Sequence, residues 1–128
     1  MSDAYEKGMK ARRTVLGDAQ VDRVSAAATE FDADFQSYIT ESAWGSVWAR
    51  EGLTLRERSM ITIGLLAALG HDAEVEMHVR AARNTGATMA DIAEVMLHVA
   101  VYAGVPAANA AIAVAKKVYA EAGPPDAA

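Results

Sequence analysis

Three histidines provide the side chains best suited to proton transfer in this chain, because the unperturbed pKa of imidazole lies closest to neutral pH. His78 follows Glu74 by four residues, and His98 follows Glu94 by four, so each pair lies on one face of a helix. Tyr102, four residues beyond His98, extends the second stripe. One such pair alone is typical of a solvent-exposed face. Two pairs on consecutive helices favour a shared cleft between antiparallel neighbours.

Metal binding is the main alternative use of these residues. Zinc sites on helices typically use two histidines four residues apart, and non-haem iron sites use two histidines and a carboxylate. No two histidines here are four residues apart. A metal site therefore requires His78, His98 and a glutamate to converge in space, and we predict no metal.

Arginines flank the start of a strongly apolar segment. Arg50, Arg56 and Arg58 lie where a helix dipole also favours an anion, and guanidinium groups there could bind carboxylates. For Arg56, an ion pair with Glu51 or Glu57 is an equally good interpretation. The pattern indicates an anionic ligand.

The elements that position these residues are expected to be helices, because no window alternates polar and β-branched residues as a strand does. Glycines, a proline and capping patterns divide the chain into six helices, over about 3–16, 18–42, 54–70, 72–84, 88–104 and 105–122. The segment 43–52 is expected to be a turn-like connection that places Trp44 and Trp48 over a pocket or an interface.

Two of these helices carry strong apolar patterns. The helix over 18–42 has one stripe at three- and four-residue steps, made by Val21, Val24, Ala28, Phe31, Phe35, Tyr38 and Ile39. The helix that begins at the capping box Thr54–Glu57 is apolar on every side between Met60 and Leu69. Such a helix should lie at the centre of the fold.

Composition favours one globular domain over residues 1–128, with a disordered tail at 123–128. The chain has 128 residues, of which 52% are hydrophobic and 23% charged. A lone domain of this size leaves apolar surface to spare, so we expect a homo-oligomer.

Charge and residue usage exclude several function classes. The net charge of -5 argues against nucleic-acid binding, which needs a basic face. Without cysteine, disulfides, thiol redox chemistry and a cysteine nucleophile are excluded. The sequence contains no signal peptide pattern and no apolar run long enough to span a membrane, so a cytoplasmic protein without membrane contact is expected.

Short groups of residues in a fixed order carry a resemblance to a known family. They are Gly8-x3-Arg12-x4-Gly17, Asp34-Phe35-Gln36, Ala43-Trp44-Gly45-x2-Trp48-x-Arg50-x-Gly52-Leu53, Arg58-Ser59-x2-Thr62-Ile63, Ala68-Leu69-Gly70, Met77-His78-x-Arg80-Ala81 and His98-x3-Tyr102-Ala103-Gly104-x-Pro106-Ala107-x-Asn109-Ala110. Each group alone is weak, but their order and spacing are specific. Over about residues 5–120, the chain resembles the carboxymuconolactone decarboxylase family of the alkylhydroperoxidase-D-like superfamily.

The resemblance implies an all-α, six-helix alkylhydroperoxidase-D-like domain that forms oligomers, with hexamers in the decarboxylase branch. The peroxidase branch carries Cys-x2-Cys-x3-His, and aligning His78 with that histidine puts His71 and Glu74 at the cysteine positions. A thiol relay is therefore impossible. The implied reaction converts 4-carboxymuconolactone, a dianionic lactone of protocatechuate catabolism, to 3-oxoadipate enol-lactone and CO2 without a cofactor.

The implied reaction assigns roles to particular residues. His78 would be the general acid or the donor to the lactone oxygen, with Glu74 orienting it, and His98 would be a second donor supported by Tyr102. The apolar walls around the departing carboxylate would include Trp44 and Trp48. The anchors for the retained carboxylate are, in order of preference, Arg58 and Arg50, then Arg12 and Arg80.

Two other classes of function stay open at this point. One is another lactone-processing enzyme on the same scaffold, an isomerase or a hydrolase. The other is a non-catalytic assembly module, in which the histidines only pack between helices. Release of CO2 distinguishes the decarboxylase from both.

Overall fold

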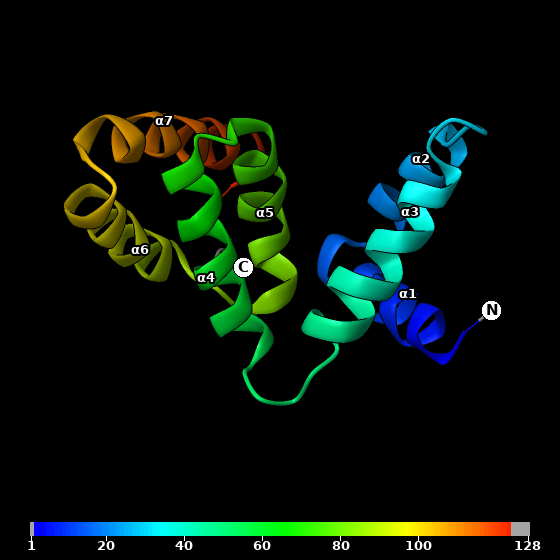
Figure 1. Ribbon diagram of the computed structural model, residues 1–128. Helices are drawn as coiled ribbons and strands as arrows, with labels where there is room; N and C mark the ends of the chain where they lie inside the picture. Colours follow the sequence, from blue (N-terminus) through cyan, green and yellow to red (C-terminus); the bar gives the residue numbers. More distant parts are fainter. Residues whose placement is uncertain (1, 124–128) are drawn as a thin grey trace. The chain divides into compact units, whose positions relative to one another are not determined.

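The computed structural model describes residues 2–123, and every regular element in that range is helical (Figure 1). The elements are α1 (Asp3–Leu16), α2 (Asp18–Ala27), α3 (Ala33–Ile39), the π-helix η1 (Thr40–Trp48), α4 (Leu55–Leu69), α5 (Asp72–Thr85), α6 (Met89–Tyr102) and α7 (Val105–Ala122). The all-α class is confirmed for this range, which holds more helices than the six predicted. Beyond Gly123, the tail that we expected to be disordered lies outside the described residues.

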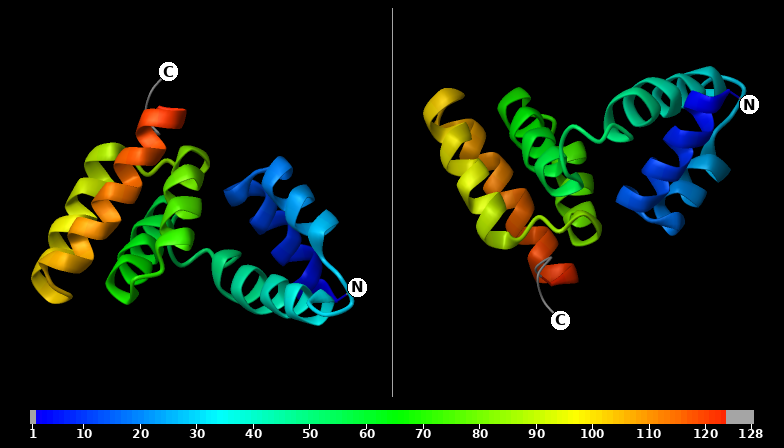
Figure 2. Two further views of the ribbon diagram at one scale, coloured as in Figure 1. Left: turned by 90° about the horizontal axis from the view of Figure 1, so that it is seen from above. Right: turned by 90° about the horizontal axis from the view of Figure 1, so that it is seen from below.

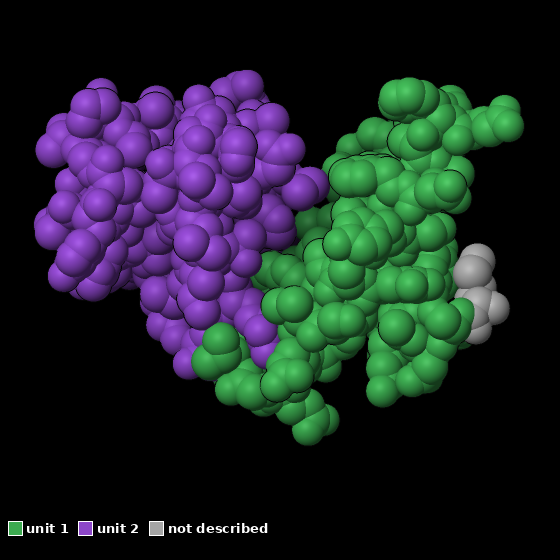
Figure 3. Space-filling view, viewed as in Figure 1, with its two compact units in different colours: residues 1–54 green, residues 55–128 purple. Residues whose placement is uncertain are grey.

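The chain divides into two compact units, which we call unit 1 (Met1–Thr54) and unit 2 (Leu55–Ala128) (Figure 3). Unit 1 holds α1, α2, α3 and η1, and unit 2 holds α4 to α7. The division falls at the capping residue where the sequence predicted a new helix to begin. A single domain over the whole chain stays a prediction.

The long helix predicted over 18–42 is wrong, because the chain leaves the helical conformation at Ala28. The side chains of Thr29 and Asp32 bond to the backbone there: Asp32 Oδ1 accepts from the Thr29 amide at 2.7 Å, and Thr29 Oγ1 accepts from the Phe31 amide at 3.2 Å. Such local bonds compete with helical ones and favour a break. The apolar stripe is interrupted with it: Val21 is buried, whereas Phe31 is 98% exposed.

The segment predicted to be a turn-like connection is instead mostly the π-helix η1. Its wide turn brings Trp44 and Trp48 into a stack, with ring centroids 5.0 Å apart and planes at 29°. Both tryptophans are buried, as expected from their size. π-helices are rare and occur often at functional sites, which makes η1 a feature of interest.

Close contact between α1 and η1 holds unit 1 together. A Cβ atom added at Gly8 would lie 1.9 Å from the carbonyl oxygen of Thr40, and one added at Gly45 would lie 2.2 Å from that of Ala4. Both distances are far below van der Waals contact, so only glycine fits at these positions. The two backbones therefore pack directly against each other.

Unit 2 is a four-helix arrangement. Helix α4 packs against α5, α6 and α7, and α7 also packs against α5 and α6. Figures 1 and 2 show α4 beside α5, and α6 beside α7. The core of unit 2 is aliphatic. Its most deeply buried residues include Ile63, Val75, Val79, Ala82, Ile92, Ala111 and Val118.

Several predicted helix boundaries are confirmed. Gly17 and Gly86 follow the last residues of α1 and α5, and Gly86 adopts the left-handed conformation with φ of 87°. Thr88 and Asp91 form the predicted capping box at the start of α6. Pro106 lies in the first turn of α7, where its missing N–H costs no helical bond.

The central position of α4 is confirmed, but its burial on every side is wrong. Ile63 and Ala67 are fully buried, whereas Leu65 is 60% exposed and Ile61 and Leu69 are also exposed. Helix α6 is similarly apolar and also leaves one face exposed. No helix in residues 2–123 has both the length and the apolar composition that crossing a membrane requires.

Candidate active site

His78 lies on the buried side of α5, in the interior of unit 2. Only 6% of the residue is exposed. Burial lowers the pKa of His78 from about 6.5 to about 4, and the charge of Glu74 one turn earlier opposes this shift without cancelling it. The imidazole is therefore neutral at physiological pH, with one ring nitrogen carrying a proton that it can donate in a hydrogen bond.

His98 lies in a different environment, on an exposed face of α6. Its ring stacks on Tyr102, with centroids 6.2 Å apart and planes at 13°. Both rings line an apolar groove of about 520 Å³ between α4 and α6, to which Ile61, Gly64 and Leu65 also contribute. The two helices lie close at Gly64, where an added Cβ atom would lie 3.3 Å from Val95 Cγ1.

His78 and His98 do not share the groove between α4 and α6. Helices α5 and α6 are not a main packing pair. Helix α5 packs against α4 and α7, and so does α6. Consecutive helices in the sequence are therefore not the antiparallel neighbours that we expected. No three histidine, aspartate or glutamate side chains in residues 2–123 are close enough together to hold a metal ion.

The arginines of unit 2 have different environments. Arg58 is buried in α4, in the same unit as His78. Arg80 forms an ion pair with Glu121, with Nη2 2.6 Å from Oε2. Arg58, the first-ranked anchor, is therefore buried, whereas Arg80 is exposed and ion-paired.

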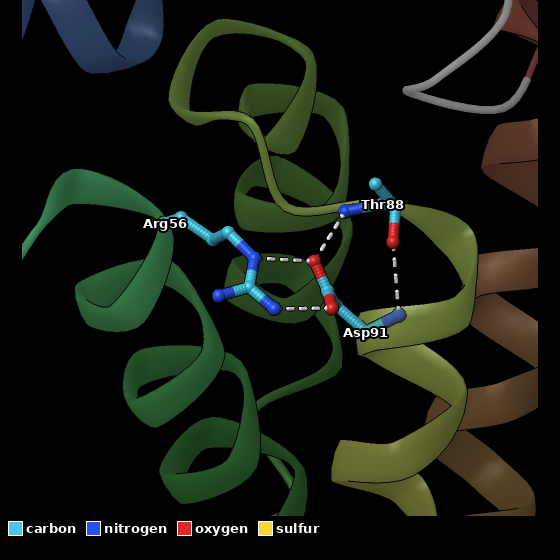
Figure 4. A network of polar contacts seen from close by, with 3 residues as sticks. All are labelled: Arg56, Thr88 and Asp91. Carbon is cyan, nitrogen blue, oxygen red and sulfur yellow. Dashed lines mark hydrogen bonds and ion pairs between the residues drawn. The ribbon is translucent and has the colours of Figure 1, made fainter.

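Arg56 pairs with neither glutamate that the sequence suggested. Its Nε and Nη2 donate to the two carboxylate oxygens of Asp91 at 2.8 and 2.6 Å, as Figure 4 shows. Asp91 Oδ2 also accepts from the Thr88 amide, and the Thr88 hydroxyl accepts from the Asp91 amide. The guanidinium and these bonds hold the pKa of Asp91 well below its usual range. The network joins the start of α4 to the start of α6.

Arg12 is buried in unit 1 among neutral partners. It is 7% exposed, and its Nη1 and Nη2 donate to Thr40 Oγ1 and Gln36 Oε1, each at 3.1 Å. Burial lowers the pKa of Arg12, and the neighbouring Tyr5 raises it. No ion pair joins Arg12 to a carboxylate within residues 2–123. A buried guanidinium with neutral partners only is a site where a ligand carboxylate is favoured.

The remaining predicted site residues of unit 1 are the two tryptophans and Arg50. Trp44 and Trp48 form the buried stack in η1, and Arg50 is exposed just after it. Their roles stay predictions, as do those of the histidines, Glu74 and the other arginines.

Sequence reasoning missed the partners of two arginines. Gln36 and Thr40 were not singled out, although Gln36 belongs to the Asp34-Phe35-Gln36 group of the resemblance and lies four residues before Thr40. Asp91 was used only as a capping residue, because its pairing with Arg56 joins residues 35 apart in the sequence. Polar residues within an apolar helix pattern are the signal that could have identified Gln36 and Thr40.

Comparison with known proteins identifies the family of this chain. The sequence pattern of the carboxymuconolactone decarboxylase family matches residues 33–117. The chain is 43% identical over 119 residues to 4-carboxymuconolactone decarboxylase of Acinetobacter baylyi, covering 93% of this chain and 89% of that protein. It is 41% identical over 113 residues to nitrosuccinic acid decarboxylase of Metarhizium robertsii, covering 88% and 79%.

A further similarity, 49% identity over 41 residues, relates the chain to 4-carboxymuconolactone decarboxylase of Pseudomonas putida, covering 32% of this chain and 85% of that sequence. The family pattern spans more than half of the chain, and the Acinetobacter baylyi protein aligns with nearly all of it. The chain therefore belongs to the carboxymuconolactone decarboxylase family.

Proposed function

We propose that this chain is a carboxy-lyase that converts 4-carboxymuconolactone to 3-oxoadipate enol-lactone and CO2 without a cofactor. The observation that carries the proposal is the 43% identity, over 93% of this chain, to 4-carboxymuconolactone decarboxylase of Acinetobacter baylyi. The neutral, buried His78 and the buried arginines provide groups that suit the chemistry of this substrate.

The substrate holds its own electron acceptor. When the bond to the leaving carboxylate breaks at the quaternary ring carbon, its electron pair moves through the ring double bond into the lactone carbonyl. CO2 leaves, and negative charge develops on the lactone oxygen. A proton from solvent must then reach the carbon next to that carbonyl, which gives the enol-lactone. The protein has to stabilise the oxygen, deliver the proton and hold the retained carboxylate.

His78 is the preferred donor to the lactone oxygen. Its lowered pKa keeps it neutral, so it can donate a hydrogen bond but does not store an extra proton at pH 7. A group of this kind stabilises the developing oxyanion without first losing a charge of its own. His98 lines a separate groove, so a role for it as a second donor to the same substrate requires a second copy of the chain to bring it there.

Arg58 is the preferred anchor for the retained carboxylate, because it is buried in the same unit as His78. A buried guanidinium binds a carboxylate more strongly than an exposed one, since water competes less. Arg12 is the second choice because it is also buried, although it belongs to unit 1. Arg80 ranks below both because Glu121 already occupies it, and Arg50 because it is exposed.

Nitrosuccinate is a second candidate substrate, favoured by the 41% identity to nitrosuccinic acid decarboxylase. As its name states, it is a succinate with a nitro group. 4-Carboxymuconolactone also contains a succinate unit, made by the quaternary carbon, its carboxylate and the neighbouring CH2–carboxylate arm. In both molecules, an electron-accepting group next to one carboxylate allows that carboxylate to leave as CO2. A site that binds the carboxylate that is retained would therefore accept both substrates.

The test is to follow 4-carboxymuconolactone by ultraviolet absorbance while measuring CO2. We expect loss of the lactone with one equivalent of CO2. A parallel assay measures CO2 release from nitrosuccinate. Loss of the lactone without CO2 would instead indicate an isomerase or a hydrolase. No turnover of either compound would leave the assembly module as the better interpretation.

His78→Gln tests the role of the buried imidazole in that assay. Turnover should fall on the order of 10² to 10³, the contribution typical of one preorganised donor to a developing oxyanion. The matched control is His71→Gln, because His71 is exposed at the start of the same helix. Wild-type turnover in a folded His78→Gln variant would rule out the assignment.

We also propose that the chain works as a homo-oligomer with the alkylhydroperoxidase-D-like arrangement of its family. The exposed apolar side chains on α4 and α6 support self-association, because monomers rarely leave such surfaces in water. A hexamer is the state that family resemblance implies.

A further inference from the structure

Arg12 has hydrogen-bond donors that no described residue uses. A guanidinium carries five N–H donors. One bond from Nη1 to Thr40 Oγ1 and one from Nη2 to Gln36 Oε1 take two of them. The Nε atom is buried, and nothing within residues 2–123 accepts a hydrogen bond from it. Buried donors normally have acceptors, so Arg12 favours a further one.

The two partners of Arg12 make its surroundings richer in donors than in acceptors. Gln36 Oε1 accepts from Arg12, which fixes the orientation of the amide and leaves the two N–H groups of Nε2 as donors. The Thr40 hydroxyl donates to the backbone carbonyl of Gln36 at 2.7 Å, so it can only accept from Arg12. We call Arg12, Gln36 and Thr40 the Arg12 cluster.

The charge of Arg12 is not compensated within residues 2–123. The ion pairs of this range join other residues. Tyr5, a phenol and not a carboxylate, is the neighbour whose charge raises the pKa of Arg12. Only 7% of Arg12 is exposed, so water screens the guanidinium little. A buried ion without a counter-charge is costly, and an anion is therefore favoured at the cluster.

The chemistry of the cluster suits a carboxylate. Gln36 and Thr40 are neutral, so the single cation compensates one negative charge. Phosphate carries roughly two at neutral pH and would keep one uncompensated. The two oxygens of a carboxylate also match the planar fork of a guanidinium. Because little of Arg12 reaches the surface, the ligand has to be small at the end that binds.

We propose that the Arg12 cluster binds the carboxylate of a small organic acid. Arg12 supplies the charge, the Gln36 amide adds a neutral donor, and Thr40 holds the guanidinium in place. The inference goes beyond the proposed function, because it concerns unit 1 alone and requires no decarboxylation. Arg58 stays the preferred anchor for the carboxylate that the substrate retains.

Acetate is the probe for this site, and acetamide, its neutral isostere, is the control ligand. Sodium acetate replaces sodium chloride at constant ionic strength while tryptophan fluorescence is recorded. Both tryptophans lie in η1, the helix that begins at Thr40. We expect a saturable change with acetate and none with acetamide, and a higher midpoint of urea unfolding in acetate. Tighter binding of inorganic phosphate than of acetate would overturn the assignment of the ligand as a carboxylate.

Gln36→Glu tests the location by placing a carboxylate next to Arg12 within the chain. It keeps an acceptor for Arg12 and adds the negative charge that acetate would bring. Acetate should then bind about tenfold or more weakly, because the cation is already compensated. Gln20→Glu is the matched control, since it makes the same change beside the exposed Arg23. It should bind acetate as the wild type does, and Gln36→Glu should unfold at a higher urea concentration than this control.

Arg12→Lys keeps the charge but removes the planar fork, so it should also weaken acetate binding. Equal acetate binding in Gln36→Glu and Gln20→Glu would place the acetate elsewhere and overturn the inference. The same holds if acetate binds to Arg12→Lys as it does to the wild type, or if the wild type shows no saturable change. None of these measurements needs turnover. A failure of the proposed function therefore leaves this inference intact, and a failure here leaves the proposed function to its own assay.

Discussion

Burial of a single imidazole links the acid stability of this protein to one residue. The pKa of His78 is about 4 in the folded chain and about 6.5 when unfolded, so between these values the unfolded state binds more protons. Stability is therefore complete above pH 6.5 and decreases as the pH falls towards 4. Integration over the range from pH 7 to 5 gives a loss of about 2 kcal/mol.

Urea unfolding at pH 7 and pH 5 measures this loss. His78→Gln should remove it, because glutamine does not titrate, whereas His71→Gln should retain it. Asp91 does not interfere in this range. Its lowered pKa means that its stabilising contribution is lost only when the pH falls below about 4. An equal pH dependence in the wild type and His78→Gln would contradict the prediction.

The guanidinium of Arg12 makes a contribution that lysine cannot replace. It donates to Thr40 Oγ1 and Gln36 Oε1 through two nitrogens, and a single ammonium lacks this planar fork. Arg12→Lys should lower the free energy of unfolding by about 2 kcal/mol, the usual range for buried bonds to a charged group. Urea unfolding followed by tryptophan fluorescence measures it, since both tryptophans belong to unit 1.

Arg23→Lys is the matched control for this substitution. Arg23 is exposed and bonds to Gln20, a neighbour on the same helix. Its replacement should change the unfolding free energy by less than about 0.5 kcal/mol. Equal effects at Arg12 and Arg23 would show that the buried fork adds no stability.

At the scale of elements, the start of α6 depends on one capping residue. The Thr88 hydroxyl accepts from the Asp91 amide at 3.1 Å, and the Thr88 amide donates to the Asp91 carboxylate that binds Arg56. Thr88→Ala should destabilise the protein by about 1 kcal/mol in thermal or urea unfolding. Thr88→Ser keeps the hydroxyl and should restore most of the loss. A full loss in the serine variant would point to the methyl group instead.

The contact between α1 and η1 leaves no room for a side chain. A Cβ atom at Gly45 would lie 2.2 Å from the Ala4 carbonyl oxygen, and backbone atoms cannot move aside as a side chain can. Gly45→Ala should therefore cost about 3 kcal/mol or more in unfolding free energy.

Gly52→Ala is the control for Gly45, because nothing lies within 4 Å of a Cβ atom added there. We expect a change within about 0.5 kcal/mol in the same unfolding experiment. A similar loss at both glycines would mean that the effect arises from glycine as such and not from the contact between the helices.

For the whole molecule, the sequence predicted those features that short-range physics controls. Glycines 17 and 86, the capping box at Thr88 and Pro106 mark helix ends because each acts on its own neighbours. The break at Thr29 was missed because its stabilising bonds come from polar side chains inside an apolar stripe. The π-helix was missed because its turn does not follow the 3.6-residue period on which helix prediction relies.

The candidate site shows the same limit more strongly. Residue types and spacing identified the histidines and arginines, but not which of them meet. The sequence placed His78 and His98 on consecutive helices, but it does not show that both helices pack mainly against α4 and α7. Contacts between distant segments also decide which arginines are buried, as Arg12 and Arg58 are. The same holds for the pairing of Arg56 with Asp91.

The apolar outer surface of α6 also has a thermodynamic consequence. If two copies bury it together, association and folding share one equilibrium, and the melting temperature rises with total protein concentration by mass action. Dilution then acts on this protein as a mild denaturant does on others. The melting temperature would therefore be higher at the protein concentrations of an overexpressing cell than in a dilute assay.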